Sequence, residues 1–317
     1  MKKIIIISGP TACGKTNASL HLADYLLKKG KEISIVNFDS LLFYRELNIG
    51  TAKPDIKQRK SIEHHLIDIA SIKNPINASL FIKLAVPLIN ELHKKNKIII
   101  LIGGSGFYLR ALFKGMYPAV TQEEIRNELI DIYRKRGINS IHKILAKKDP
   151  VSFKNIHPND HYRIIRATEY HLSSGECISQ QKQKMNERSP YDLNKNIHSN
   201  WNFNHCYLDI PKEEHSNIIN KRTQNIIEKG LIEEVTLLLN KGFTGLERPL
   251  QSIGHKQALD FINGKLSQEN LVNEINLRTR RLAKAQRTFF KKIITKKEYH
   301  GIKDIKKIVK DNFEFVG

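Results

Sequence analysis

The chain has 317 residues, 40% of them apolar, and its 53 Lys and Arg residues outnumber 32 Asp and Glu, giving a formal net charge of +21. This length predicts one large or two smaller domains with a real core. The charge favours a polyanionic partner such as nucleic acid, although a lysine-rich proteome would also produce it. Its three cysteines form no C-x-x-C pair, which argues against a zinc knuckle or a disulfide framework and favours a reduced, cytosolic protein. No apolar run reaches membrane-spanning length, and we expect no signal peptide.

The first predicted element is a strand over residues 3–8, whose continuous apolar run is typical of a strand buried on both faces. A complete G-x-x-x-x-G-K-[ST] sequence follows, and residues 17–29 then repeat apolar positions at helical spacing. In this context the glycines let backbone N–H groups surround an anion, the lysine adds a full charge and the threonine can hold Mg²⁺. We therefore predict a ligand with two or more linked phosphates, nucleotide or not, bound by Gly9, Pro10, Thr11, Ala12, Cys13, Gly14, Lys15 and Thr16.

Two further predicted strands end in polar residues. Residues 32–38 lead into Asp39, and residues 97–102 lead into a Gly-Gly pair followed by Ser105. Because ligands of α/β sheets bind at the carboxyl ends of the strands, we expect Asp39 and Ser105 near the phosphate loop. Two plainer alternatives remain: Asp39 could cap a helix over residues 41–47, and the Gly-Gly pair could be a simple tight turn.

A short strand is also predicted over residues 64–69, which begins with His64 and His65. Adjacent histidines suggest metal ligands at first sight. Successive residues of a strand face opposite sides, however, and no Cys or carboxylate cluster supports the pair. We therefore do not expect a metal site there.

From about residue 118 the pattern changes to short amphipathic helices, and no strand signal returns until about residue 203. A capping box, Thr121-x-x-Glu124, opens the first helix, others cover residues 141–146 and 160–173, and the polar residues 179–200 predict a loop. We therefore predict a helical insertion over residues 118–200 within an α/β core made of residues 1–117 and 201–317. Arg163 and Arg166 share a helix face, where they would bind phosphate or simply be solvated.

After the strand near residue 203, helices are predicted over residues 212–228, 231–239 and 267–297. Nine of the twenty residues from 278 to 297 are Lys or Arg and none is acidic. The expected inward stripe is Leu282, Ala285, Phe289 and Ile293, and the expected basic stripe is Arg280, Lys284, Arg287 and Lys291. A solvated face would normally include acids, so we favour contact with a phosphate backbone.

Taken together and in order, these motifs resemble the bacterial tRNA dimethylallyltransferases, also called isopentenyl-diphosphate:tRNA transferases. The resemblance covers nearly the whole chain: the phosphate loop, Asp39-Ser40 with Tyr44-Arg45, NIGTAKP at 48–54, HHLID at 64–68, GGSG at 103–106, HPND at 157–160 with Arg163, Arg166 and Ala167, GHKQ at 254–257, and Lys284 with Gln286, Thr288 and Phe289. Four positions depart from the family pattern, which usually has Ser for Cys13, Thr for Ser105, Tyr for His255 and Trp for Phe289.

The resemblance implies a P-loop NTPase-like parallel α/β sheet with helices on both faces and an all-helical insertion. It implies that the loop holds dimethylallyl diphosphate with Mg²⁺ at Thr16, and that the acceptor is the N6 amine of the adenosine 3′-adjacent to the anticodon, position 37, in tRNAs reading codons that begin with U. Asp39 would be the general base, Lys15 and Arg222 would bind diphosphate, and Ser105 would orient the diphosphate or the amine. Contacts to the anticodon stem-loop are expected from Asp39, Ser40, Leu41, Leu42, Ser105, Arg126, Tyr162, Arg163, Ile164, Ile165, Arg166, Arg280, Lys284 and Arg287.

Two other functions explain part of the pattern. A small-molecule or nucleotide kinase would use the same loop and Asp39, but it would not need the acid-free basic helix. An RNA-binding protein whose loop only senses a nucleotide would need the helix, but it would not modify a base. We expect a monomer, because no sustained exposed apolar stripe is visible, and the cysteine usage favours the cytoplasm.

Overall fold

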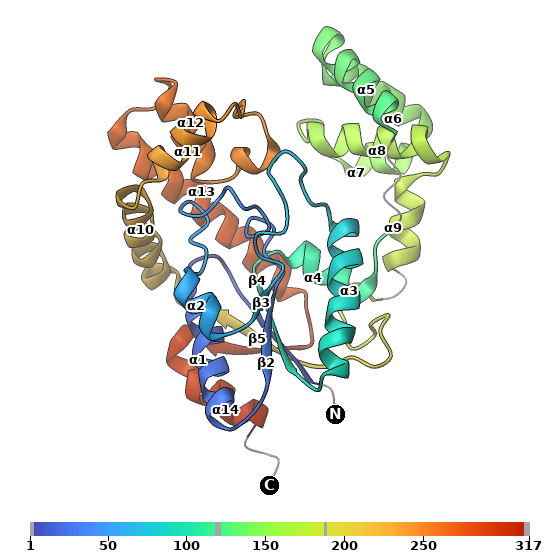
Figure 1. Ribbon diagram of the computed structural model, residues 1–317. Coiled ribbons are helices and arrows are strands. Elements are labelled where there is room, and N and C mark those ends of the chain that lie inside the picture. Colours follow the sequence, from blue (N-terminus) through green and yellow to red (C-terminus); the bar gives the residue numbers. More distant parts are fainter. Residues whose placement is uncertain (1–2, 118–121, 187–188, 314–317) are drawn as a thin grey trace. The chain divides into compact units, whose positions relative to one another are not determined.

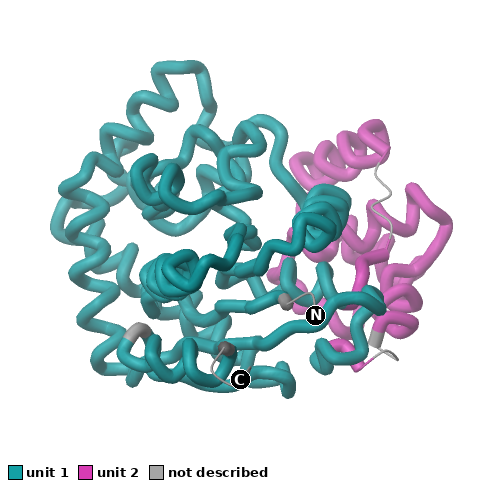
Figure 2. The backbone as a smooth tube through the Cα atoms, turned by 60° about the horizontal axis from the view of Figure 1, so that its bottom comes forward, with its two compact units in different colours: residues 1–113, 191–317 teal, residues 114–190 magenta. Residues whose placement is uncertain are grey.

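The computed structural model describes residues 3–117, 122–186 and 189–313 (Figure 1). The chain separates into a larger unit, residues 1–113 with 191–317, and a smaller unit, residues 114–190 (Figure 2). The expected insertion, 118–200, therefore extended too far toward the C-terminus. Residues 191–200 belong to the larger unit, where Leu193 is fully buried in the core.

Among the described residues of the larger unit, six parallel strands form one sheet in the order β3-β2-β4-β1-β5-β6. Successive residues of a strand face opposite sides, so β1 buries Ile4 and Ile6 in one core and Ile5 and Ile7 in another. This accounts for the continuous apolar run in its sequence. The strands are β1 Lys3–Ser8, β2 Ile33–Asn37, β3 His64–His65, β4 Ile98–Gly103, β5 Asn202–Asp209 and β6 Lys296–His300.

Helices cover both faces of this sheet, which confirms the predicted P-loop-type α/β core. The core that contains Ile4 receives side chains from α3, α4 and α13, and the core that contains Ile5 receives them from α1 and α14. A third apolar cluster joins α11, α12 and α13. The helices of this unit are α1 Lys15–Lys28, α2 Ile56–Ser61, α3 Ala78–Lys94, α4 Gly106–Lys114, α10 Lys212–Glu228, α11 Leu231–Asn240, η1 Arg248–Gln251, α12 His255–Ile262, α13 Gln268–Lys291, η2 Gly301–Asp304 and α14 Ile305–Phe313.

The smaller unit contains only helices among its described residues, and they enclose a core of their own around Leu129, Ile141 and Tyr170. One prediction was wrong here, since α9 occupies the start of the expected loop. Asp149 explains this, because its carboxylate caps α7 at Ser152 and also accepts hydrogen bonds from the backbone and hydroxyl of Ser179. Thr121 of the predicted capping box lies outside the described residues. The helices are α5 Glu123–Arg136, α6 Ile138–Lys148, α7 Pro150–Asn155, α8 His161–Ser174 and α9 Ile178–Asn186.

The C-terminal helix also differs from its prediction. It ends at Lys291 rather than at residue 297, and the residues that follow form the edge strand β6. Its buried face contains Ala283 and Phe290, whereas Leu282 is 40% exposed and Ala285 is exposed. A short lysine-rich edge strand has no helical or alternating apolar pattern of its own, so the basic composition concealed it. None of the described helices combines the length and the apolar character needed to cross a membrane.

Candidate active site

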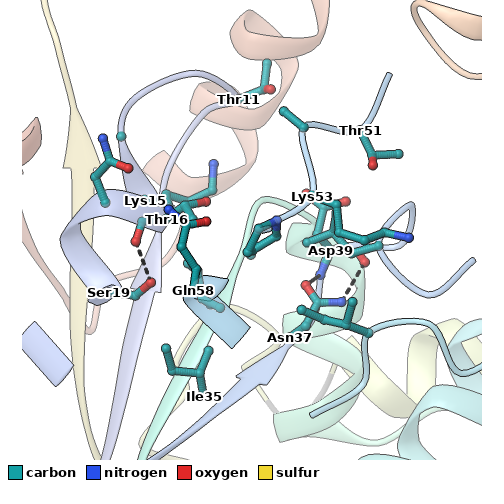
Figure 3. A pocket seen from close by; sticks show the side chains of 18 of the residues that line it. Thr11, Lys15, Thr16, Ser19, Ile35, Asn37, Asp39, Thr51, Lys53 and Gln58 are labelled. Atoms are coloured by element: carbon teal, nitrogen blue, oxygen red, sulfur yellow. Dashed lines mark hydrogen bonds between the residues drawn. The ribbon is translucent and has the colours of Figure 1, made fainter. Parts of the chain in front are cut away.

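A cavity of about 410 Å³ opens at the carboxyl edge of the sheet, where β1, β2 and β4 end side by side (Figure 3). Lys15 and Thr16 lie on one side, and Asp39, Thr51 and Lys53 lie across from them. Further parts of the wall come from the rest of the phosphate loop, the end of β4, segment 51–54 and α10, which contribute Thr11, Ala12, Gly14, Gly103, Ala52, Pro54 and Arg222. The strand ends thus bring together the loop and carboxylate that the sequence predicted.

The phosphate loop has the backbone geometry of an anion cradle. Gly9 and Gly14 have φ angles of 156° and 91°, which L side chains rarely adopt, and a Cβ on Gly9 would collide with the carbonyl oxygen of Leu208. The first helical residue of α1 is Lys15, so the free N–H groups of the helix N-terminus face the loop. Lys15 Nζ donates to the carbonyls of Gly9 and Pro10, at 3.1 and 2.8 Å, which holds the ammonium at the loop.

Cys13 has no direct part in this cradle. Its side chain is buried in the core beside α1 and does not line the cavity. Burial raises the pKa of the Cys13 thiol, while the positive charge of Lys15 opposes that shift. The replacement of the family's usual serine therefore leaves the anion-binding surface unchanged.

Asp39 is held by a buried neighbour that the sequence did not single out. Asn37 is 1% exposed, its amide oxygen accepts from the backbone N–H of Asp39 at 2.9 Å, and its amide nitrogen donates to the Asp39 carbonyl (Figure 3). The same amide nitrogen also donates to the carbonyl of Leu66. Asp39 Oδ1 accepts from the N–H of Leu41 at 3.2 Å. The helix-capping alternative was wrong, because residues 41–47 form turns instead of a helix. A buried polar residue at the end of a strand was the available signal for Asn37.

Ser105 and Arg222 contribute in different ways. The hydroxyl of Ser105 accepts from the N–H of Ser40 at 3.3 Å, so it fixes the segment after Asp39, but it is not part of the cavity wall. Arg222 on α10 does line the cavity, and its Nη2 donates to the carbonyl of Thr51 at 3.4 Å. Burial lowers the pKa of the Arg222 guanidinium, and the negative charge of Asp39 opposes that shift. An anion in the cavity would compensate this desolvated cation.

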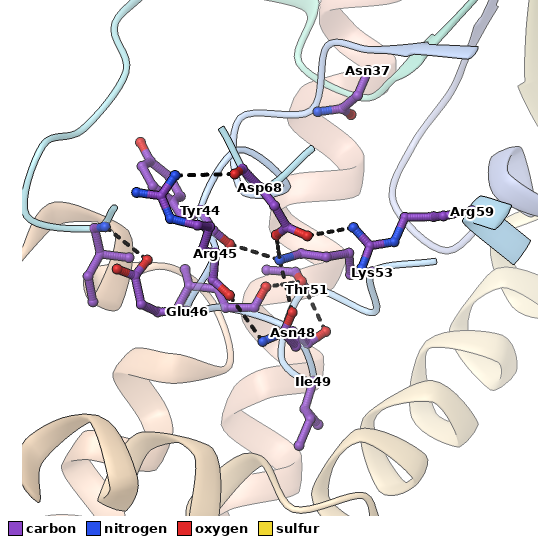
Figure 4. A network of polar contacts seen from close by, with 12 residues as sticks. Asn37, Tyr44, Arg45, Glu46, Asn48, Ile49, Thr51, Lys53, Arg59 and Asp68 are labelled. Atoms are coloured by element: carbon purple, nitrogen blue, oxygen red, sulfur yellow. Dashed lines mark hydrogen bonds and ion pairs between the residues drawn. The ribbon is translucent and has the colours of Figure 1, made fainter. Parts of the chain in front are cut away.

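The cavity wall at segment 51–54 is supported by a polar network (Figure 4). The Lys53 ammonium is almost fully buried and donates to the Tyr44 carbonyl at 2.8 Å and to the Asp68 carboxylate. Arg59 binds the other oxygen of Asp68. Burial lowers the pKa of Lys53 while its bond to Asp68 raises it. The predicted motifs at residues 48–54 and 64–68 therefore build one side of the cavity.

A second support, Glu234 on α11, was missed. Its carboxylate accepts from the backbone N–H groups of Asn48, Ile49 and Gly50 at 2.7, 2.8 and 3.1 Å, and it pairs with His255 Nε2 at 3.1 Å. The side chain of His255 is fully buried, so the replacement of the family's tyrosine belongs to this internal contact. Nothing in the local sequence links Glu234 to a loop more than 180 residues away.

The predicted RNA-contacting residues have different environments. Arg126, Tyr162 and Arg163 in the smaller unit, and Arg280 and Lys284 on α13, are exposed. Two of the other predicted contacts are engaged inside the protein, since Arg166 pairs with Glu169 and Arg287 binds Asp209. The side chain of Ile164 is fully buried in the core of the smaller unit, and Ser40, Leu41, Leu42 and Ile165 are half-buried. Arg287 and Ile164 therefore do not belong to an exposed RNA-binding surface.

The site also fits a magnesium ion that takes only one or two of its ligands from the protein. Among the described residues, no group of three or more His, Cys, Asp or Glu side chains is placed to hold a metal ion. Thr16 lines the cavity and Asp39 lies across it. Mg²⁺ commonly takes one or two protein oxygens and completes its octahedron with phosphate and water. These residues fit an ion that is held mainly by a bound diphosphate.

A model of the family described as IPP transferase matches residues 42–293. The chain belongs to the IPP transferase family. It is 36% identical over 290 residues to the tRNA dimethylallyltransferase of Syntrophobacter fumaroxidans, covering 91% of this chain and 80% of the relative. It is 33% identical to that of Thermotoga maritima, covering 98% and 99% of the two chains.

Solved structures agree with this membership of the IPP transferase family. The tRNA isopentenylpyrophosphate transferase of Bacillus halodurans superposes with a TM-score of 0.67 at 30% identity, covering 97% of this chain and 94% of that one. A eukaryotic dimethylallyltransferase acting on tRNA shares the fold, with a TM-score of 0.74 at 23% identity over 99% and 77% of the chains. The predicted resemblance is confirmed. The phosphate loop lies before the residues that the family model matches, whereas the Thermotoga maritima relative matches 98% of this chain.

Proposed function

We propose that this protein transfers a dimethylallyl group from dimethylallyl diphosphate to the N6 amine of adenosine 37 in tRNAs that read codons beginning with U. The observation that carries the proposal is a single cavity with a diphosphate cradle on one side and the Asp39 carboxylate on the other (Figure 3). Family membership and the names of its relatives support prenyl transfer to tRNA. We also propose that the enzyme is a cytoplasmic monomer.

The reaction forms a bond between N6 and C1 of the dimethylallyl group and breaks the bond from C1 to the diphosphate oxygen. Negative charge then accumulates on the leaving diphosphate. Lys15 and Arg222, which line the cavity, and the loop N–H groups would stabilise that charge, which is the kind of fixed electrostatic contribution that speeds such steps most. Mg²⁺ at Thr16, when bound, would neutralise further charge on the same oxygens.

Asp39 has the role of general base. The lone pair of the exocyclic amine is delocalised into the adenine ring, so the amine is a weak nucleophile until it loses a proton. Transfer of that proton to the Asp39 carboxylate balances the reaction, because the amine gains a carbon and gives up a hydrogen. Asn37 and the N–H of Leu41 fix the carboxylate in the cavity while this occurs.

The adenine must leave the anticodon loop to enter the cavity, as it does in enzymes that act on a base. Residues 40–42 follow Asp39 directly, and Leu42 lines the cavity, so this segment is the expected contact for the extruded base. We propose that Arg280 and Lys284 on α13, and Arg126, Tyr162 and Arg163 in the smaller unit, contact the anticodon stem-loop.

The direct test is incubation with labelled dimethylallyl diphosphate, Mg²⁺ and an anticodon stem-loop that carries adenosine at position 37. We expect label in the RNA, and none in a matched stem-loop with guanosine at that position. Label in both RNAs, or in neither, would contradict the proposal. Magnesium-dependent consumption of ATP without RNA would instead support the kinase, and tight RNA binding without modification would support the nucleotide-sensing RNA-binding protein.

A further inference from the structure

The tip of the phosphate loop is held through both backbone groups of one residue, Thr11. Its N–H donates to Gln286 Oε1 at 2.8 Å, and its carbonyl accepts from His215 Nε2 at 2.7 Å. Gln286 belongs to α13 and His215 to α10, so two helices far along the chain reach the loop. Thr11 itself lines the cavity, beside the residues that would hold the diphosphate.

His215 is fixed in one tautomer by a further chain of contacts. Arg287 Nη2 donates to His215 Nδ1 at 2.8 Å, so that nitrogen is an acceptor and the proton lies on Nε2, where it is donated to Thr11. Arg287 is itself held by both oxygens of Asp209, at 2.9 and 3.0 Å, and by the carbonyl of Ile210. The imidazole is 2% exposed, and burial lowers its pKa, which keeps it neutral at physiological pH.

Gln286 connects two strand ends at once. While its amide oxygen accepts from Thr11, its amide nitrogen donates to the Gly104 carbonyl at 3.0 Å. Gly104 has no side chain, and a Cβ there would lie 2.6 Å from Gln286 Nε2, so only glycine admits the amide this closely. The loop after β1 and the loop after β4 are therefore held at a fixed separation by one side chain.

We propose that Gln286, His215 and Arg287 form a clamp that fixes the diphosphate loop at Thr11, which makes them positioning residues for the leaving group. The proposal rests on the proposed function for its substrate, but it concerns the loop geometry alone. Anion binding by backbone N–H groups depends on all of them converging on the same oxygens. Without the clamp the loop would lose that convergence, although none of the three side chains forms part of the cavity wall.

The test replaces one arm of the clamp at a time, in His215→Leu and Gln286→Leu. Binding of inorganic pyrophosphate with Mg²⁺ is measured by calorimetry, and kcat and KM are measured with a saturating stem-loop. We expect each variant to weaken pyrophosphate binding about tenfold, equivalent to about 1.4 kcal/mol, and to raise KM for the prenyl donor. Asn273→Ala, an exposed position on the same helix, is the matched control and should leave both values unchanged.

A conservative variant separates positioning from mere structural support. His215→Gln retains a donor near the place of Nε2 and should recover most of the pyrophosphate affinity. If the role of His215 were purely structural, the pyrophosphate affinity of each variant would instead follow its thermal stability. If either leucine variant fails to fold, Gln286→Glu keeps the acceptor for Thr11 and loses the donor to Gly104, and it should also weaken pyrophosphate binding. Folded variants that bind pyrophosphate as the wild type does would overturn the clamp.

These outcomes are distinguishable from failure of the proposed function. If the clamp variants weaken pyrophosphate binding but the wild type transfers no prenyl group to RNA, the clamp stands and the function is wrong. If the wild type prenylates RNA and the clamp variants keep the same KM and pyrophosphate affinity, the function stands and the clamp is wrong.

Discussion

Removal of the Glu234 carboxylate tests whether segment 48–54 is held in place from α11. In Glu234→Ala the backbone N–H groups of Asn48, Ile49 and Gly50 lose their shared acceptor, and His255 loses its partner. An unsatisfied buried donor costs about 1–3 kcal/mol, and water entering the vacated space would recover part of that. We expect a loss of about 2–4 kcal/mol in the free energy of unfolding.

The measurement is the urea midpoint of the larger unit, followed by the KM for dimethylallyl diphosphate. Because Thr51, Ala52 and Lys53 line the cavity, a loosened segment should raise this KM while stem-loop affinity stays constant. Glu233→Ala is the matched control, since Glu233 is the exposed neighbour on the same helix. A variant at Glu234 that is as stable as the control, with an unchanged KM, would refute the reasoning.

The same carboxylate predicts a pH dependence. Burial raises the pKa of Glu234, but the bonds from His255 and the three backbone N–H groups outweigh it and place the pKa below its ordinary 4.5. A lowered folded pKa means that the stability contribution is present above pH 4.5 and is lost as pH falls through the folded value. Glu234→Gln should therefore lose stability at pH 7 and show a weaker decline below pH 4.5 than the wild type.

Three further predictions concern the chemistry, the RNA and the core. Asp39→Asn should keep stem-loop affinity while kcat falls by about 10²–10⁴; a collapse of binding would make Asp39 structural. The double variant Arg280→Gln, Lys284→Gln should reduce the slope of log affinity for the stem-loop against log salt by about 1–2, with pyrophosphate binding unchanged; an equal slope would place both outside the RNA interface. His205 is buried beside Ser8, and burial lowers its pKa from 6.5 to about 3, so stability should fall by about 2 kcal/mol between pH 6.5 and 5. In His205→Gln the urea midpoint should fall less over this pH range than in the wild type. An identical decline in the variant and the wild type would contradict the prediction.

The sequence alone was sufficient to predict those features of the fold and the site that depend on residues close together in the chain. The phosphate loop, its flanking strand and helix, and the position of Asp39 at a strand end all follow from local pattern and from the geometry of parallel sheets. Asn37 could have been found the same way, as a polar residue inside an apolar strand. β6 could not, because an edge strand of sequence KKEYH has neither apolar alternation nor a turn signal.

The supports of the site depend instead on contacts that the chain order conceals. Glu234 reaches its loop across 186 residues at Asn48, and Gln286 reaches Thr11 across 275. Arg287 is the clearest case of a contact that the sequence could not predict. Helical periodicity placed this residue beside Arg280 and Lys284 on a basic stripe. The stripe prediction considered only charge, whereas Asp209 offers both carboxylate oxygens on the side facing the sheet. A half-buried acid on another element outweighed the tendency of an arginine to face solvent.

Helix α13 therefore has two chemical faces, and this division has a functional consequence. Arg280 and Lys284 on one face are exposed. On the other face, Gln286 accepts a hydrogen bond from Thr11 directly. Arg287 donates to His215, which in turn donates to Thr11. A helix is stiff over such a short distance, so the separation between the two cations that we propose to contact RNA and the phosphate loop is fixed by the helix itself. Because prenyl transfer needs the adenine amine and C1 of the donor within a few ångströms of each other, one rigid element that holds both binding surfaces would supply much of that alignment.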